Sequence, residues 1–316
     1  MRVAVFGAGG VGAYFGGRLA VAGHEVSFIA RGAHLEALRA GGLSVESVSG
    51  DFEVAPVEAT DQPEAIGPVD VVLVTVKAWQ VRQAAKALRP LLGEATVVLP
   101  LQNGVEAPSE LAEEIGAERV LGGLCKIISE IVGPGRIRHF GAEPYIALGE
   151  IGAGPGPRTE ALRLALQEAG VTAEIPRDIE AAMWEKFVFI AAVSGVGAVT
   201  RETLGILLEL PETRRLLVGA LEETRAVAEG LGIPISPDIV GATLTFLESL
   251  PPHTTASMQR DLMDGRPSEL EYQNGSVVRL GRRAGVATPL HGFLYASLLP
   301  MELKARGLPA AAKLGR

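Results

Sequence analysis

The sequence Gly-Ala-Gly-Gly-Val-Gly, from Gly7 to Gly12, constrains the fold of this chain more than any other segment. A short apolar run, Val3–Phe6, precedes it, and a segment with helical spacing, Val11–Val21, follows it. A second strand candidate, Glu25–Ala30, comes next, as a βαβ unit requires. The chain has 39 glycines, so the motif alone would be weak, but this strand–turn–helix context is the one that gives G-x-G-x-x-G its meaning.

The glycines of this motif have different roles. Gly7 allows a tight turn, Gly9 lets the backbone approach a pyrophosphate, and Gly12 lets the helix pack closely on the strand. The helix N-terminus then offers unpaired amides and a positive dipole end to phosphate oxygens. We therefore expect Gly7, Gly9, Gly10 and Gly12 to bind a dinucleotide; the alternative is a plain strand–turn–helix without a ligand.

Strand candidates alternate with helical segments through the first half of the chain. Val69–Val76 is an almost uninterrupted Val/Leu run, which is typical of a parallel strand buried on both faces. The alternation predicts an N-terminal doubly wound, Rossmann-type parallel sheet. Between about Lys126 and Glu150, short strand-like pieces surround Gly-Pro-Gly, and we expect an antiparallel edge there. The remaining candidates are strands at Leu43–Val48, Thr96–Leu101 and Val120–Gly123, and a helix at Val81–Leu92.

The pattern changes after the loop Gly152–Pro157, where the strand signal fades. From Ile179 onward nearly every segment has helical spacing, which predicts an all-helical C-terminal domain. We place a dinucleotide-binding domain at residues 1–176 and a helical substrate and catalytic domain at residues 177–316. The predicted helices are Ala181–Val199, Pro211–Leu231, Pro237–Ser249, Ser268–Ala284 and Leu290–Ala305.

Composition excludes several classes of function. The net charge of −8 and the pI of about 5.3 argue against broad binding to nucleic acid or to an anionic membrane surface. The chain has a single cysteine, Cys125, so it can form no intrachain disulfide, which fits the cytoplasm. We expect Cys125 to be a small buried or loop residue and not a nucleophile. Phe187–Val199 is too short for a membrane span and is interpreted as a core helix. The five histidines lack metal-ligand spacing, so no metal is expected. The sequence leaves the oligomeric state open, a homodimer included.

The end of the second strand candidate bears on which dinucleotide binds. NAD enzymes commonly place Asp or Glu there to accept a hydrogen bond from the ribose 2′-hydroxyl. This chain has Arg31 instead, which can bind a 2′-phosphate and stack on adenine. Arg31 therefore predicts NADP; the alternative is an ordinary solvated arginine.

Two polar positions follow strands of the predicted sheet. Lys77 comes directly after Val69–Val76, and Gln102-Asn103-Gly104 directly after Thr96–Leu101. Ligands of open α/β sheets bind beyond the carboxyl ends of the strands, so Lys77 and Asn103 are candidate cofactor or substrate contacts. The alternatives are a surface lysine and a turn-forming asparagine.

With these residues in place, the whole chain resembles the ketopantoate reductase (2-dehydropantoate 2-reductase) family. The resemblance rests on GAGGVGAYFGGRLA, ARG at 30–32, VTVKAWQ at 74–80, LQNGVE at 101–106, MWEKF at 183–187, and the segment from Ser257 through ELEYQNG at 269–275. It implies reduction of ketopantoate by NADPH to pantoate, on the route to pantothenate, and a helical second domain.

The resemblance also implies roles for five residues. Lys186 matches the catalytic lysine and would also contact the substrate. Asn103 matches an asparagine near nicotinamide and substrate, and Lys77 a lysine on the cofactor side. Ser257 matches a substrate-binding serine, and Glu269 an acidic residue near the nicotinamide ribose and the lysine. The chemistry agrees, because a protonated lysine can stabilise charge on a ketone oxygen and then donate a proton. Burial would disfavour that ammonium, and a nearby carboxylate such as Glu269 would favour it.

This chain departs from the family at three expected asparagines. Ile190, Ser194 and Leu204 occupy those positions, of which Ser194 still offers a hydroxyl for substrate binding. Asn274 is present and is interpreted as a helix-face residue that packs between the two domains. The substitutions predict a more apolar substrate pocket, which favours the first of two alternatives that stay open. One is a related reductase for a different, more apolar 2-oxo acid or ketone, and the other is an NADP-binding sensor without catalysis.

Overall fold

The computed structural model describes residues 1–309 and 314, and its contacts divide the chain into two compact units. Unit 1 comprises Met1–Gln102 and Ala107–Ile179, and unit 2 comprises Asn103–Glu106 and Glu180–Arg316. The domain boundary at residues 176 and 177 stays a prediction.

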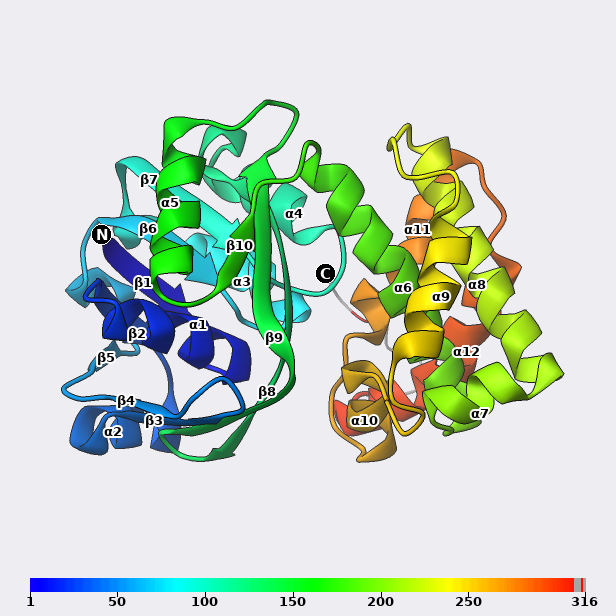
Figure 1. The fold of residues 1–316 in the computed structure, drawn as a ribbon, viewed down its shortest axis with the longest axis horizontal. Helices are drawn as coiled ribbons and strands as arrows, with labels where there is room; N and C mark the ends of the chain where they lie inside the picture. The colour runs from blue at the N-terminus through cyan, green and yellow to red at the C-terminus, as the bar shows by residue number, and fades with distance from the viewer. Residues whose placement is uncertain (310–313, 315–316) are drawn as a thin grey trace. The chain divides into compact units, whose positions relative to one another are not determined.

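Unit 1 is built on a parallel sheet with the strand order β5-β2-β1-β6-β7, all pairs parallel (Figure 1). The sheet strands are β1 (Arg2–Phe6), β2 (Glu25–Ile29), β5 (Glu58–Thr60), β6 (Val69–Val74) and β7 (Leu92–Pro100). The helices of the unit are α1 (Gly10–Val21), α2 (Gly32–Gly41), α3 (Val81–Ala87), α4 (Ala107–Ile115) and α5 (Pro157–Glu168), with short 3₁₀ helices η1 (Pro63–Ala65), η2 (Ala78–Gln80), η3 (Arg89–Leu91) and η4 (Ala117–Arg119).

Both faces of this sheet are covered by apolar side chains, as the Val/Leu runs require. Along β1, Val3 and Val5 pack in a core shared with α1, whereas Ala4 and Phe6 pack in a second core shared with α3 and α4. Successive side chains of β1 therefore point to opposite faces of the sheet and pack in two different cores. The predicted doubly wound Rossmann-type sheet is confirmed.

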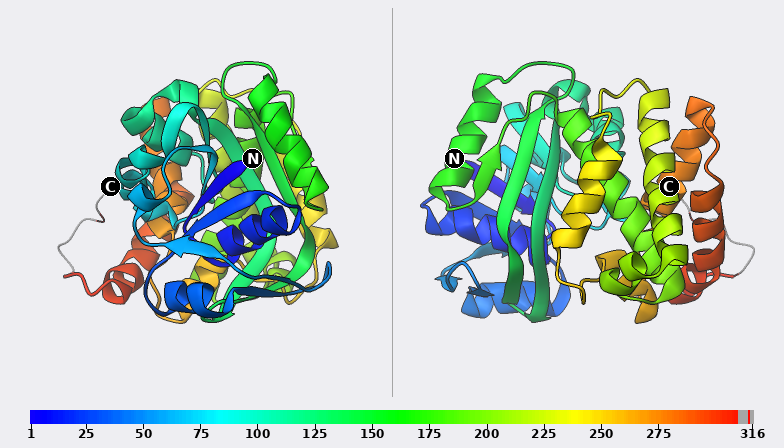
Figure 2. Two further views of the ribbon diagram at one scale, coloured as in Figure 1. Left: turned by 90° about the vertical axis from the view of Figure 1, so that its left-hand side faces the viewer. Right: turned by 45° about the vertical axis from the view of Figure 1, so that its right-hand side comes forward.

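A second, mixed sheet completes unit 1, and here the structure differs from two expectations. Its strands run β10-β9-β3-β4, with β8 antiparallel to β9. Their bounds are β3 (Leu43–Ser47), β4 (Phe52–Val54), β8 (Leu121–Gly133), β9 (Arg136–Glu150) and β10 (Thr172–Glu174). The strand expected near residue 43 forms, but it pairs in this sheet, and the short β5 takes the edge of the parallel sheet. The antiparallel pairing expected between about Lys126 and Glu150 is present, but it is formed by two long strands lying side by side, β8 and β9, and not by short pieces (Figure 2).

Helix α1 packs against strands of both sheets through its glycines. A Cβ atom on Gly16 would lie 2.7 Å from the Phe28 ring of β2, and one on Gly17 would lie 2.8 Å from the Phe52 ring of β4. Cys125 on β8 is buried in the same core, as expected. Any larger residue at these two glycines would push the helix off one sheet or the other.

Unit 2 is helical, as predicted. Its helices are α6 (Ile179–Thr200, whose first residue belongs to unit 1), α7 (Leu204–Glu209), α8 (Pro211–Gly230), α9 (Ile239–Ser249), α10 (Ser257–Met263), α11 (Asn274–Ala284) and α12 (Pro289–Ala305), with the 3₁₀ helix η5 (Leu270–Tyr272). The helix expected over Ser268–Ala284 is interrupted at Gln273, where φ is −111° and ψ is −90°. By length and composition alone, α6 could cross a membrane, but 67% of its apolar window is buried inside the structure, as in a core helix.

A buried polar network joins α6, α8, α11 and α12 through His291. Its Nδ1 accepts a hydrogen bond from Asn274 Nδ2 (3.0 Å), which also donates to the Ala191 carbonyl oxygen (3.0 Å). Its Nε2 lies 3.0 Å from the Ala220 carbonyl oxygen and 2.9 Å from Thr224 Oγ1. With Nδ1 accepting and Nε2 donating, the ring is neutral. Burial lowers the pKa of His291 to about 4, although the Ala220 carbonyl opposes that change.

This network predicts a stability that depends on pH. The pKa of His291 is lower in the folded state than the ordinary value of 6.5, so the unfolded state binds more protons below pH 6.5. Stability is full above pH 6.5 and is lost as the pH falls to about 4, by up to about 3 kcal/mol. We expect His291→Gln to remove this component. Urea unfolding at several pH values, followed by Trp184 fluorescence in a Trp79→Phe background, measures the difference from the parent protein. Burial also lowers the pKa of His24 and of His34, but both proteins contain these residues, so their contributions cancel in the difference. If the free energy of unfolding depended on pH in the same way in both proteins, the prediction would be wrong.

Candidate active site

The glycine turn follows β1 and is held by four hydrogen bonds. Gly7 has a φ of +110°, which favours glycine, and a Cβ there would lie 2.8 Å from the Val76 amide nitrogen. The amides of Gly7 and Ala8 both donate to the Ile29 carbonyl oxygen (3.2 and 3.1 Å), and the Gly9 amide donates to the Gly7 carbonyl (2.7 Å). Thr75 Oγ1 also donates to that carbonyl (2.8 Å). The turn is thus fixed by β2 and by the residue after β6.

The other glycines of the motif have the surroundings that a dinucleotide pyrophosphate needs. Gly9 precedes α1, and a Cβ there would meet nothing within 4 Å, so the backbone is open to a ligand. A Cβ on Gly12 would overlap the Gly7 carbonyl oxygen and Thr75 Oγ1, so helix and turn are in direct contact. Gly10 faces the Ser129 carbonyl of β8, where a Cβ would come within 2.6 Å. The Ser129 hydroxyl is buried and has no hydrogen-bond partner in the described part of the chain. These residues fit a bound pyrophosphate.

Arg31 and Lys77 lie at the same edge of the sheet as this turn. The parallel register pairs Phe6 with Ile29 and with Val74, so the residues after β1, β2 and β6 emerge together. Arg31 is exposed at the start of α2, and Lys77 is exposed with its ammonium 5.9 Å from the centre of the Trp79 ring. The structure thus groups Arg31 and Lys77 with the glycine turn; their cofactor contacts stay predictions.

In unit 2, the structure brings Lys186 and Asn103 together. Lys186 Nζ, from the second turn of α6, donates a 2.9 Å hydrogen bond to Asn103 Oδ1. Both residues are half-buried. An ammonium has three N–H donors and no acceptor, so this bond fixes one donor direction and leaves the charge on the nitrogen.

The other predicted substrate residues are also in unit 2. Glu269 directly precedes η5 and is 7% exposed. Its Oε2 lies 3.5 Å from Gln273 Nε2. Ser257 is exposed at the first position of α10, whereas Ser194 is 1% exposed inside α6. The roles of Lys186, Asn103, Glu269, Ser257 and Ser194 stay predictions.

The residues at the expected asparagine positions have different surroundings. Ile190 is one helical turn after Lys186, is half-buried, and belongs to none of the hydrophobic cores among the described residues. Its position therefore places an apolar side chain on the same helix face as the lysine. Leu204 is 2% exposed and packs in the core of unit 2.

Two contacts near this site had no signal in the sequence. Gln102 Nε2 donates to the carbonyl oxygens of Val74 and Val76 (2.9 Å each), which ties the end of β7 to the end of β6. Glu106 bonds Arg279, 173 residues further along the chain. A polar residue in a loop gives no indication of so distant a partner. No group of three or more metal-binding side chains occurs in residues 1–309 or at 314.

Comparison with known proteins identifies the class. The family model described as Ketopantoate reductase PanE/ApbA matches residues 3–153, and that of its C-terminal domain matches residues 178–302. An uncharacterized oxidoreductase of Bacillus subtilis, YkpB, is 33% identical over 96% of this chain and 99% of its own length. A 2-dehydropantoate 2-reductase of Mesorhizobium japonicum is also 33% identical, over 92% and 94% of the two chains.

Solved structures of similar proteins have the same fold. A 2-dehydropantoate 2-reductase from Geobacter metallireducens is 33% identical, with a TM-score of 0.89 over 95% of this chain and 99% of the other. A D-mandelate dehydrogenase solved with NADH and anilino(oxo)acetate, 24% identical over 97% and 99% of the two chains, shares the fold with a TM-score of 0.88. The fold and the matches define an oxidoreductase. The chain belongs to the ketopantoate reductase family, a family of NAD(P)-dependent reductases.

Proposed function

We propose that this protein reduces 2-dehydropantoate (ketopantoate) to pantoate with NADPH, as a step of pantothenate biosynthesis in the cytoplasm. The observation that carries the proposal is the hydrogen bond between Lys186 Nζ and Asn103 Oδ1. It supports a lysine held in a fixed direction, which is what proton donation to a ketone oxygen requires. We further propose that the protein binds neither nucleic acid nor membranes. Whether it forms a homodimer stays open.

Residues of unit 1 would bind the cofactor, and residues of unit 2 would bind the substrate and supply the proton. The glycine turn would hold the pyrophosphate, and Arg31 would bind the 2′-phosphate with Lys77 nearby. Reduced nicotinamide supplies a hydride to the ketone carbon when bound. Lys186 stabilises the negative charge that develops on the ketone oxygen and donates the proton that completes the alcohol. Asn103 orients the ammonium, Glu269 favours its charged form, and Ser257 and Ser194 bind the polar groups of the substrate.

The direct test is the loss of NADPH absorbance with ketopantoate, with formation of pantoate measured in the same samples. We expect stoichiometric oxidation of NADPH and formation of pantoate. NADPH binding without turnover of any 2-oxo acid or ketone would favour the non-catalytic sensor and overturn the proposal.

The choice of cofactor predicts the effect of Arg31→Ala. Loss of a charge-assisted contact with the 2′-phosphate should weaken NADPH binding by about 1.5–3 kcal/mol and leave NADH binding nearly unchanged. Titration of both cofactors against both proteins measures the effect. An equal loss for NADPH and NADH would show that Arg31 does not bind the 2′-phosphate.

The role of Lys186 predicts a loss of kcat. Lys186→Ala should lower kcat by roughly 10²–10⁴-fold while NADPH still binds, because the proton donor is gone but the cofactor contacts remain. Glu269→Ala should lower activity and move the pH profile, since the carboxylate favours the charged lysine. Near-normal turnover by the Lys186 variant would contradict its assignment as the proton donor.

A second candidate substrate is a more apolar 2-oxo acid or ketone. Ile190 favours it, because this side chain stands one turn from Lys186, outside the hydrophobic cores, and cannot hydrogen-bond the hydroxyl of ketopantoate. A buried hydroxyl without a partner costs about 1–3 kcal/mol. The D-mandelate dehydrogenase of the same fold was solved with anilino(oxo)acetate, an oxoacetate that carries an aromatic ring.

This candidate predicts that Ile190→Asn changes specificity. In the parent protein, the deoxy analogue of ketopantoate should compete well with ketopantoate, and the variant should move preference toward ketopantoate by roughly one to two powers of ten in kcat/KM. Both substrates are measured with both proteins. A strong preference of the parent protein for ketopantoate would mean that another group binds the hydroxyl.

A further inference from the structure

The segment Asn103–Glu106 depends on unit 2 for its position. It follows β7 in the chain but packs with unit 2, and it is neither helix nor strand. Gly104 has a φ of +110°, and a Cβ there would lie 3.0 Å from the Tyr272 carbonyl oxygen, so the segment passes close to the backbone of η5. Without regular hydrogen bonding of its own, the segment needs side-chain contacts to fix where Asn103 lies.

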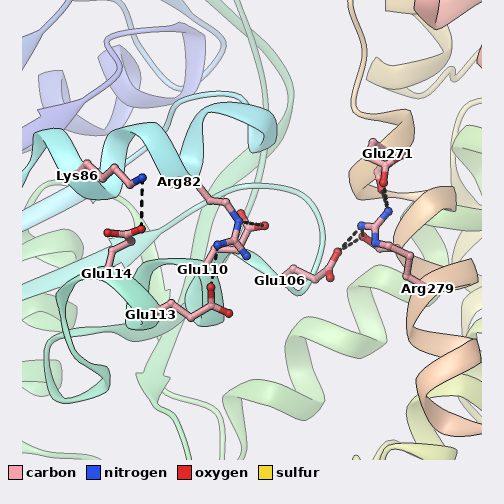
Figure 3. Close-up of polar contacts among 9 residues, drawn as sticks. Arg82, Lys86, Glu106, Glu110, Glu113, Glu114, Glu271 and Arg279 are labelled. Atoms are coloured by element: carbon pink, nitrogen blue, oxygen red, sulfur yellow. Dashed lines mark hydrogen bonds and ion pairs between the residues drawn. The ribbon is translucent and has the colours of Figure 1, made fainter. Parts of the chain in front are cut away.

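Glu106 provides that contact. Its Oε2 accepts a 2.8 Å hydrogen bond from Arg279 Nη2 (Figure 3) and a short one from the Ser276 hydroxyl. Both donors are on α11. The Glu106 side chain is 12% exposed and that of Arg279 is 24% exposed, so the pair is largely shielded from water. A shielded, charge-assisted contact is stronger than a surface ion pair.

Arg279 bonds a second carboxylate at the same time. Its Nη1 donates to a carboxylate oxygen of Glu271 and to the Glu271 backbone carbonyl (3.0 Å). Tyr295 of α12 donates to the other Glu271 oxygen (2.6 Å), and burial and this bond raise the pKa of the Tyr295 hydroxyl, so it stays a donor. One cation therefore joins Glu106 of the loop segment to Glu271 of η5.

The shape of the guanidinium matters here. Two terminal nitrogens on one rigid plane direct hydrogen bonds to two different carboxylates, which a lysine ammonium on a flexible stem cannot reproduce. Without the arginine, Glu106 and Glu271 would be two shielded negative charges with less compensation, and the segment would lose its charged contact with α11.

We propose that Arg279 is a positioning residue for the reaction: by binding Glu106 and Glu271 together it holds Asn103–Glu106 against α11 and so keeps Asn103 Oδ1 at Lys186. The inference rests on the proposed role of Lys186. Arg279 acts through the segment rather than on the reacting atoms.

The test combines Arg279→Lys with Asn103→Ala. Arg279→Lys should lower kcat about tenfold with the KM for NADPH unchanged, because the ammonium of Lys186 loses its fixed direction. In the Asn103→Ala background the same substitution should cause no further loss, since Asn103 transmits the effect. Glu106→Gln, which keeps the volume and an acceptor oxygen, should give a smaller loss of kcat that also disappears in that background.

Arg225→Lys is the matched control. Arg225 also bonds two glutamates, Glu222 (2.8 Å) and Glu229 (2.6 Å), but all three residues are on α8. The substitution Arg225→Lys should leave kcat unchanged. Equal loss of kcat by Arg279→Lys with and without Asn103 would overturn the proposal. Should Arg279→Lys fold poorly, the Glu106→Gln pair decides by the same criterion.

A second measurement does not depend on turnover. Hydrogen exchange of the backbone amides of residues 103–106 should rise about tenfold in Arg279→Lys and stay unchanged in Arg225→Lys. Unchanged exchange in the Arg279 variant would overturn the proposal even if kcat falls. If the parent protein reduces no 2-oxo acid or ketone, the proposed function fails, and this exchange still decides whether Arg279 holds the segment.

Discussion

The close packing of α1 is the constraint on which unit 1 depends. Gly12 brings the helix against the turn at Gly7, while Gly16 and Gly17 bring it against aromatic rings of β2 and β4. Glycine has no side chain to separate these elements, so van der Waals contact is made by the backbone itself. The same close approach also places the N-terminus of α1 directly after the turn at the end of β1, at the edge of the parallel sheet where phosphates bind in such folds.

Unit 2 depends on a different constraint, because the polar side chains buried among its helices need hydrogen-bond partners. Its buried polar side chains form local networks, such as the one around His291, or ion pairs, such as the one around Arg279. Each network joins helices that are distant in sequence, so loss of one member would leave a buried partner unsatisfied. The Lys186–Asn103 pair lies within such a helical framework, which restricts the directions open to both side chains.

The features that the sequence predicted well are those with a local physical cause. The Val/Leu strands and the strand–turn–helix around the glycine motif depend on neighbours within a few positions, and the parallel sheet followed from the alternation of strands and helices. The pairing of β3 in the second sheet and the three-residue β5 could not be predicted, because both depend on strand pairing between distant segments. Lys186 and Asn103, 83 positions apart, were connected only through the family resemblance, and Arg279 gave no sequence signal.

The path of the chain makes the two units inseparable by a single cut. The chain enters unit 2 at Asn103, returns to unit 1 at Ala107, and enters unit 2 again at Glu180. A fragment that begins at Glu180 would therefore carry Arg279 and Ser276 without Glu106, leaving one carboxylate where the cation normally binds two. Recombination with a relative meets the same barrier, because a helical unit taken from another protein must match Asn103–Glu106, which this chain carries between two segments of unit 1. A chimera that joins unit 1 of this chain, with Glu106, to the helical unit of a relative would keep this ion pair only if the relative supplies a cation in the place of Arg279.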